Sequence, residues 1–335
     1  SRSFVEYHPG VATSYNYLAG AYSNKGELDK ALEYYHKSLV MRLKTIGENH
    51  TSVIISYINI ANVYSGKGEL DKALEFFGKS LTISLNTLGE NHPNVADTYG
   101  GMANVYYSGA LDEARDYYHK SLTIRLNIHG ENHPDLATPY NNIADVYSDN
   151  DELDEALNYY RKSLAIRIHT YGENHPSVAV SYNNMANAYS DKENLHNALE
   201  YYRKSLTIQL NNMGENHPEL ATSYDNIANM YNEKGELDHA LEYHHKSLTI
   251  KLNSLGEKHP DVAESLHNIG VLYIEKSQFD KAEDALNKSV RIKLKLVGEN
   301  HAITAMSYAS LGQVYAIQGH IDRAYKCHHK VLAIY

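Results

Sequence analysis

Apolar residues recur along this chain at the spacing of helices. Between residues 178 and 189 they stand three or four positions apart, at Val178, Tyr182, Met185, Ala186 and Tyr189. A second stretch occupies 153–168, with apolar residues at Leu153, Ala156, Leu157, Tyr160, Leu164 and Ile168. Each set forms one apolar stripe along a helix, and the alternation typical of strands is absent. The pattern therefore predicts an all-α protein.

The two stretches form one unit that repeats through the whole sequence. Its period is marked by a series of histidines at steps of 41 or 42 residues: His8, His50, His92, His133, His175, His217, His259 and His301. A fixed period of this length is the signature of a solenoid. We therefore expect a single array over residues 1–335, with no second domain. Its eight units lie near 8–49, 50–91, 92–132, 133–174, 175–216, 217–258, 259–300 and 301–335.

The sequence Gly-Glu-Asn-His-Pro, or a near-copy of it, stands at each junction between units, as at 89–93 and 172–176. A histidine beside a glutamate at every junction could indicate a ladder of metal sites. Neighbouring copies are separated by helices, however, and thus by about 10 Å or more, whereas zinc needs ligand nitrogens about 2.0–2.1 Å from one ion. Glycine instead suits a helix end with positive φ, and proline suits the first turn of the next helix. We interpret the motif as a structural junction whose histidine forms a cap or an inter-repeat hydrogen bond.

Small residues indicate where the two helices of a unit approach each other. One first-helix position carries Ala19, Ala61, Ala103, Ala144, Ala186, Ala228, Gly270 and Gly312. An alanine that faces a tyrosine of the neighbouring helix lets the helix axes come within about 8–10 Å. One member of each adjacent tyrosine pair, such as Tyr201-Tyr202, is therefore expected in the core. The lysine that follows, such as Lys204, is expected on a solvated outer face.

The first unit contains Tyr15-x-x-Leu18-Ala19-x-x-Tyr22 followed by Ala31-x-x-x-Tyr35. This pattern resembles the tetratricopeptide repeat. The 42-residue length resembles in particular the repeats of kinesin light chain, and also arrays that adjoin nucleotide-binding sensor domains. The resemblance implies a right-handed superhelical solenoid of eight helix-turn-helix repeats. It implies either a protein-interaction scaffold that binds extended peptide segments in its concave groove, or the sensor or oligomerisation arm of a larger signalling NTPase.

Composition excludes several other functions. The chain has 31 basic and 41 acidic residues, a net charge of −10, which disfavours binding to nucleic acid or to anionic membranes. The single cysteine, Cys327, fits a reducing compartment, and no signal peptide is apparent, so we expect a cytoplasmic protein. No phosphate-binding loop, metalloprotease motif or nucleophilic triad emerges. We therefore expect no enzymatic activity, no catalytic residue, no metal site and no cofactor.

Asparagines are concentrated in the first helices, between the packing positions, on the face that resembles the concave lining of tetratricopeptide superhelices. An asparagine amide both donates to and accepts from a peptide backbone, so these residues either line a peptide groove or bridge neighbouring first helices. The predicted peptide-binding groove consists of Asn16, Asn59, Asn62, Asn104, Asn141, Asn142, Asp145, Asn183, Asn184, Asn187, Asp225, Asn226 and Asn229.

The charge of these first helices suggests the kind of partner. Acidic residues such as Asp145, Asp191 and Glu233 accompany the asparagines, whereas Lys and Arg are nearly absent there. We therefore expect a protein or peptide partner with a neutral or basic extended segment. The final helix would leave Val331 and Leu332 partly exposed, and solenoids need polar caps. We therefore expect either that more repeats follow in the full-length protein or that molecules associate end to end through uncapped termini.

Overall fold

The computed structural model describes residues 9–299 and 301–334. His8, the first histidine of the series, lies outside the described residues. The chain divides into two compact units, Ser1–Thr170 and Tyr171–Tyr335. The helices that begin in the first unit are α2 (Pro9–Asn24), α3 (Leu28–Ile46), α4 (Thr51–Gly66), α5 (Leu70–Leu88), α6 (Pro93–Tyr106), α7 (Leu111–His129), the short 3-10 helix η1 (Pro134–Leu136), α8 (Ala137–Asp149) and α9 (Leu153–Tyr171). Those of the second unit are α10 (Pro176–Asp191), α11 (Leu195–Met213), α12 (Leu220–Glu233), α13 (Leu237–Leu255), α14 (Pro260–Glu275), α15 (Phe279–Val297), α16 (Ala302–Ile317) and α17 (Ile321–Ile334).

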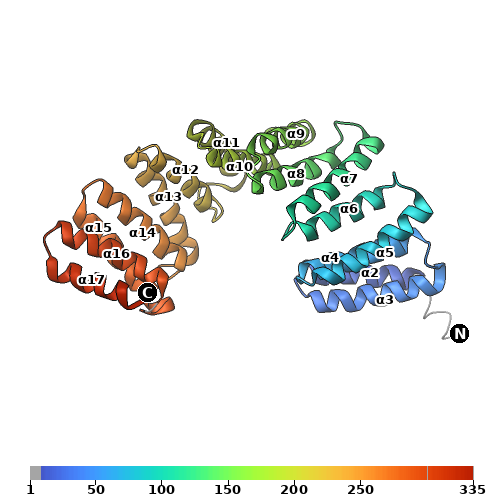
Figure 1. The fold of residues 1–335 in the computed structure, drawn as a ribbon, viewed down its shortest axis with the longest axis horizontal. Helices are drawn as coiled ribbons and strands as arrows, with labels where there is room; N and C mark the ends of the chain where they lie inside the picture. The colour runs from blue at the N-terminus through green and yellow to red at the C-terminus, as the bar shows by residue number, and fades with distance from the viewer. Residues whose placement is uncertain (1–8, 300, 335) are drawn as a thin grey trace. The chain divides into compact units, whose positions relative to one another are not determined.

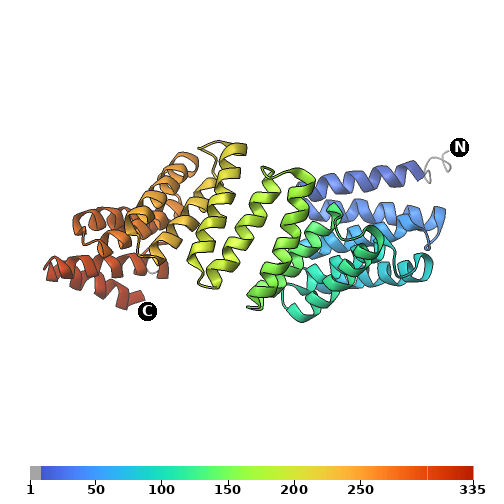
Figure 2. The same ribbon diagram turned by 90° about the horizontal axis from the view of Figure 1, so that it is seen from above.

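Each repeat is a hairpin of two antiparallel helices (Figure 1). Within each unit, successive hairpins lie side by side (Figure 2), so the second helix of one repeat packs on the first helix of the next. The residues that the structure describes contain sixteen α-helices and no strand. The prediction of an all-α protein built from eight helix-turn-helix repeats is confirmed.

The junction motif acts as a helix stop and a helix start. The glycine that follows each of the second helices α3, α5, α7, α9, α11, α13 and α15 has φ between 76° and 84°, the left-handed region that glycine adopts without strain. Glu219 is the N-cap of α12, but at the other six junctions the N-cap of the next helix is the histidine three residues later. Its Nδ1 accepts a hydrogen bond from the backbone N–H two residues further on, at 3.1–3.4 Å, in His50, His92, His133, His175, His217, His259 and His301.

This cap settles the role of the repeated histidine, because it satisfies a backbone donor that the first turn leaves without a partner. The backbone at His175 is extended, with φ −77° and ψ 141°. His50 and His301 are also extended, although threonine and alanine follow them. The extended conformation therefore belongs to the cap and does not require the proline.

The small first-helix position packs against a large side chain from the second helix of the same repeat. Ala186 is fully buried and belongs to the same apolar cluster as Tyr202, which is 6% exposed. In the seventh repeat the pair becomes Gly270 and Leu286, and a methyl group on Gly270 would lie 2.6 Å from Leu286 Cγ. The close approach therefore limits this position to alanine or glycine.

The histidine cap predicts that His175→Ala lowers the free energy of unfolding by about 0.5–2 kcal/mol. His175→Asn supplies another side-chain acceptor at the N-cap and should retain most of the stability. It loses the ring contact with Tyr171, whose centroid is 4.6 Å away, so the pair of variants separates capping from stacking. Chemical denaturation and hydrogen exchange at the Ser177 amide measure the effect. Equal losses in both variants would show that the ring contact, and not the cap, matters.

The helix contact predicts that Gly270→Ala destabilises the protein by about 1–3 kcal/mol through overpacking against Leu286, although alanine is the better helix former. Gly78 in α5 is the matched control, since a methyl group there meets nothing within 4 Å. Gly78→Ala should raise the unfolding free energy by roughly 0.5–1 kcal/mol. Thermal melting of both variants tests the contact, and a stabilised Gly270→Ala protein would contradict it.

Candidate functional site

The predicted groove residues lie on one surface of each unit, which we call the first-helix face. It is carried by α2, α4, α6 and α8 in the first unit and by α10, α12, α14 and α16 in the second. All thirteen predicted residues belong to these helices, eight, nine or twelve positions after the repeat histidine. The structure thus places them in three rows, and the rows differ in what their side chains do.

The row twelve positions after the histidine serves the core. In three repeats the phenol O–H of the buried second-helix tyrosine donates to this residue: Tyr118 to Asn104, Tyr160 to Asp145 and Tyr202 to Asn187, at 2.5, 2.6 and 2.5 Å. A buried hydroxyl without a partner is costly. These three side chains therefore stabilise their own hairpin, a role different from both groove lining and inter-repeat bridging.

The sequence held an incomplete signal for this role. Asparagine persists in this row as Asn62, where the facing side chain is Phe77 and has no hydroxyl. Conversely, the first repeat has a tyrosine on its second helix, Tyr35, but this row has Gly20 there, which offers no side-chain acceptor. The pairing between the two helices was therefore visible only once their contact was known.

One predicted inter-repeat bridge is present. Asn59 Nδ2 donates to Asn16 Oδ1 at 3.3 Å, which joins the first helices of the first two repeats. Asn141 Nδ2 donates to Asp145 Oδ2 at 2.9 Å within α8. Five predicted residues remain without a hydrogen bond from any other described residue: Asn62, Asn142, Asn183, Asn226 and Asn229. These five amides are the ones available to a ligand.

Second helices bring cations to the first-helix face. Lys251 of α13 donates to Asp225 Oδ2 at 2.7 Å and to Ser265 Oγ of α14 at 2.9 Å. Arg42 and Lys293 contact the equivalent serines, Ser56 and Ser307, at 2.8 and 2.9 Å. Counting charges on first helices alone missed these residues, because they arrive from the neighbouring helix.

Asp225 and Asp145 show opposite electrostatics. Burial opposes ionisation of Asp225, but hydrogen bonds from His244 (2.9 Å) and Lys251 outweigh it and hold the pKa of this carboxyl below its usual range. Burial dominates at Asp145 and raises its pKa, despite hydrogen bonds from Tyr160 and Asn141. The carboxylate of Asp225 is therefore stabilised by its hydrogen bonds from His244 and Lys251, whereas the nearby Arg167 offsets only part of the cost of burying the Asp145 carboxylate.

A hollow of about 460 Å³ opens on the first-helix face between α10, α11 and α12. Asn183 lines it beside Val180, which is 53% exposed. Gln209 and Met213 of α11 and Thr222 of α12 are among the other residues that line it. This combination suits an extended peptide, because the apolar surface can contact the peptide's side chains and the unpaired amide can hydrogen-bond to its backbone.

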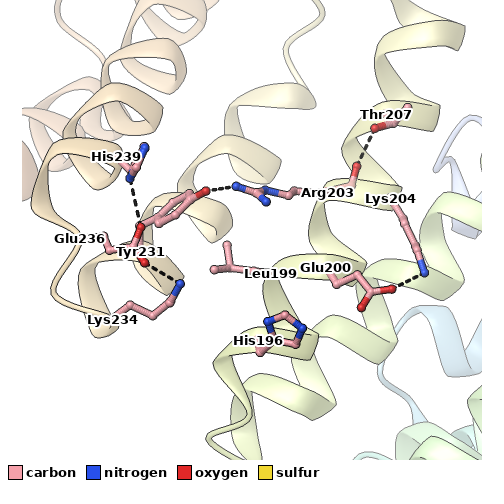
Figure 3. Close-up of a pocket in the computed structure, with 10 residues that line it drawn as sticks. All are labelled: His196, Leu199, Glu200, Arg203, Lys204, Thr207, Tyr231, Lys234, Glu236 and His239. Atoms are coloured by element: carbon pink, nitrogen blue, oxygen red, sulfur yellow. Dashed lines mark hydrogen bonds and ion pairs between the residues drawn. The ribbon is translucent and has the colours of Figure 1, made fainter.

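A second hollow, of about 610 Å³, lies on the opposite side of the hairpins, between α11, the end of α12 and α13. Figure 3 shows that its polar side chains face one another. Lys204 pairs with Glu200 at 2.6 Å, and Lys234 pairs with Glu236 at 2.6 Å. Arg203 contacts the hydroxyl of Tyr231. A ligand would have to displace these contacts, so this hollow is a weaker candidate.

The repeated lysine does more than face solvent. Tyr201 stacks on Tyr189 with ring centroids 5.4 Å apart, and Lys204 Nζ lies 4.9 Å from the Tyr201 centroid. The lysine side chain remains 44% exposed. It therefore covers the partly buried aromatic of each pair, while Tyr202 occupies the core as predicted.

One group of side chains has the composition of a metal site. His129, His133 and Asp135 each offer a ligand atom within 4.8 Å of the others. His129 lies outside the repeated series of histidines. The two rings stack with centroids 4.1 Å apart, and His133 Nδ1 already caps the Asp135 amide. Parallel rings direct their lone pairs side by side, so this arrangement suits stacking better than chelation of one ion.

The buried charge of Asp145 predicts that Asp145→Asn stabilises the protein at neutral pH, with a rise in melting temperature of about 2 °C. An amide oxygen still accepts from Tyr160, as at Asn104 and Asn187. Because the folded-state pKa of Asp145 is raised, the cost of its charge is complete above that pKa and disappears below the ordinary value of 3.8.

The advantage of Asp145→Asn should therefore shrink as the pH falls through this window. Asn187→Asp is the reverse control and should lower the melting temperature at neutral pH. Thermal melts at several pH values measure both, and a pH-independent difference would refute the assignment.

The comparisons with known proteins agree with this architecture. The tetratricopeptide repeat family model matches residues 10–86, 52–118, 107–168, 135–211, 177–253 and 219–295. No curated protein matches the chain. None of the described helices is long and apolar enough to cross a membrane.

Solved structures give similar folds. BtubC (BKLC) from P. vanneervenii is 21% identical, with a TM-score of 0.57 over 67% of this chain and 91% of that one. A putative kinesin light chain from Podosopora anserina, with nearly identical TPR-like repeats, is 25% identical, with a TM-score of 0.54 over 60% of this chain and 96% of that one. The tetratricopeptide repeat sensor protein PH0952 from Pyrococcus horikoshii, a signal transduction ATPase with numerous domains, is 17% identical, with a TM-score of 0.68 over 97% of this chain and 48% of that one. With repeat matches from residue 10 to residue 295, this chain belongs to the tetratricopeptide repeat family.

Proposed function

We propose that this protein is a non-enzymatic scaffold that binds an extended peptide segment of a partner protein on its first-helix face, similar to the cargo-binding domain of kinesin light chain. The observation that carries the proposal is the hollow between α10, α11 and α12, where the unpaired amide of Asn183 stands beside the exposed side chain of Val180. Tetratricopeptide repeats generally mediate protein–protein interactions, and a putative kinesin light chain is among the similar structures.

The rest of the face supports an extended ligand. Unpaired amides recur on successive first helices of the second unit, at Asn183 of α10 and at Asn226 and Asn229 of α12. A peptide backbone presents donors and acceptors at regular spacing, and amides read them without requiring particular side chains. The ligand is therefore defined by its extended conformation more than by a fixed sequence.

The charge of the face favours a neutral or basic segment. The cations that reach it are already used: Lys251 pairs with Asp225, and Lys293 is 6% exposed with its ammonium group on Ser307. Glu233 and Glu275 stay exposed at the ends of α12 and α14. An acidic peptide would meet these carboxylates without an available cation to compensate.

The experiment is a selection of extended peptides from a library with the purified protein, followed by affinity measurement with the selected sequence. Asn183→Ala removes the amide without disturbing a hydrogen bond and should weaken binding about tenfold, or about 1.4 kcal/mol. Asn211→Ala is the matched control, because Asn211 is exposed on α11 but does not line the hollow.

Two results would overturn the proposal. One is equal binding by the Asn183→Ala and control proteins. The other, directed at the charge preference, is tight binding of an acidic peptide that Asn183→Ala weakens and that disappears when the acidic residues of the peptide are replaced by lysine. Asn187 is unsuitable for this test, because its replacement also removes the acceptor of the Tyr202 hydroxyl.

A second candidate function is the sensor or oligomerisation arm of a larger signalling NTPase. The observation in its favour is the fold similarity to PH0952, which extends over 97% of this chain. In this case the array would be one part of a longer protein. A nucleotide-binding domain adjoining the array in the full-length gene product supports this alternative, whereas a heptad coiled coil supports the cargo scaffold. Self-association would be seen as a concentration-dependent mass in sedimentation.

A further inference from the structure

A third hollow, of about 610 Å³, lies between α13, the start of α14 and α15. Its floor is apolar: Leu248 and Val262 are buried, Leu266 and Ile292 are half-buried, and Leu252 and Leu296 are 37% and 45% exposed. Its rim carries four cations and one acid, namely Lys258, Lys288, Arg291, Lys295 and Glu257. The volume is within the usual range of ligand sites, and the apolar floor is open to solvent.

Most of these cations are not used by the protein itself. Lys288 pairs with Asp284 at 2.7 Å. Among the described residues, no hydrogen bond or ion pair reaches Lys258, Arg291 or Lys295. This distinguishes the hollow from the one in Figure 3, where the charged side chains are paired with each other.

The lining departs from most other repeats at four positions. Where this hollow has Lys258, six junctions have asparagine and the first has Tyr7; where it has Arg291, the other repeats have Val40, Thr82, Thr123, Ala165, Thr207, Thr249 and Ala333. Lys295 corresponds to Lys44, Asn86, Asn127, His169, Asn211 and Asn253, and Leu296 corresponds to Thr45, Thr87, Ile128, Thr170, Asn212 and Ser254. These four residues add positive charge and exposed apolar surface, yet Lys258, Arg291 and Lys295 form no hydrogen bond or ion pair with any residue that the structure describes. Stability of the fold does not explain them.

The fourth repeat provides an internal comparison. An equivalent hollow of about 480 Å³ is lined by Glu131, Asn132, Tyr140, Lys162, Ala165, Ile166 and His169. Asn132, Ala165 and His169 occupy the positions of Lys258, Arg291 and Lys295. The shape of the hollow and one lysine, Lys162 or Lys288, therefore belong to the repeat, whereas the further cations Lys258, Arg291 and Lys295 are absent from the fourth repeat.

We propose that this hollow is a second binding site, which takes a short acidic segment of a partner protein with leucine- or phenylalanine-sized side chains between its carboxylates. The apolar side chains would cover Leu252 and Leu296, and the carboxylates would pair with Lys258, Arg291 and Lys295. Arginine and lysine beside an apolar floor provide both charge complementarity and buried area. On a chain with a net charge of −10, a local excess of cations selects an acidic partner instead of repelling it.

This site differs from the first-helix face in position and in chemistry. Its cations stand on α15 and on the loop before α14, and none of its lining residues belongs to the hollow at Asn183. The first-helix face favours neutral or basic segments, whereas this hollow favours acidic ones. The two sites therefore bind different segments.

The test uses a fluorescein-labelled peptide of about ten residues in which two leucines are flanked by glutamates. Fluorescence anisotropy should show binding that weakens with added salt. The double variant R291T/K295N restores the residues of the sixth repeat at exposed positions, so the fold should persist. It should weaken binding about tenfold, while Lys30→Thr combined with Lys72→Asn, which removes two exposed cations in the first unit, should leave binding unchanged. Circular dichroism confirms that both proteins are folded.

Other outcomes identify other occupants and overturn the proposal. Equal affinity of R291T/K295N and the unmodified protein excludes this hollow as the peptide site. Binding to phosphatidylserine vesicles, abolished by the same variant and without peptide binding, assigns the patch to membranes. A dimer in sedimentation that the variant dissociates assigns it to a second copy of the chain. Peptides selected for the first-helix face should bind R291T/K295N normally, so failure here is distinguishable from failure of the proposed function.

Discussion

The contact between the two helices of a hairpin constrains everything else in this protein. A ring or branched side chain of the second helix rests on a position of the first helix that has room for a methyl group at most, as Leu286 on Gly270 shows. This contact fixes the rotation of both helices and thereby decides which residues face the core. It also brings the polar tip of each buried tyrosine close to the row of asparagines on the first helix. The hydrogen bond from Tyr202 to Asn187 is a direct result of that geometry.

The fold could be predicted from the sequence because the signals for helix ends, helix starts and buried positions agree with one another. The glycine at each junction, such as Gly172, needs positive φ, and His175 starts the next helix with its own side chain. The apolar stripe then places Val178 and Met185 in the core. Such agreement across levels leaves few alternatives. The histidine's role was left open because a ring nitrogen can cap its own helix or reach another repeat, and only the backbone geometry decides between them.

The site was less readable, because several of its residues act through a neighbouring helix. All the asparagines predicted for the groove lie on first helices, but the sequence could not tell the free amide of Asn183 from that of Asn187, which accepts a hydrogen bond from a tyrosine. The same limitation hid Lys251, which belongs to a second helix and reaches Asp225 within its own repeat and Ser265 across the repeat boundary. Side chains that cross from one helix to another depend on the packing angle and the length of the side chain. Neither is recorded in the periodicity of a single helix.

The hollow of the fourth repeat shows how a further binding site could arise in this protein. It has the same frame as the charged hollow of the seventh repeat, but Ala165 and Asn132 leave it without the added cations. Its core residues need not change for the rim to change, since the two sets occupy different faces of the same helices. A few surface substitutions would therefore give the chain a further binding site for the same partner. Two such sites on one chain raise the effective concentration for the second binding event of a divalent partner. Each such hollow is thus a potential binding site, and mutations of its rim alone could increase the avidity of the protein without changing its fold.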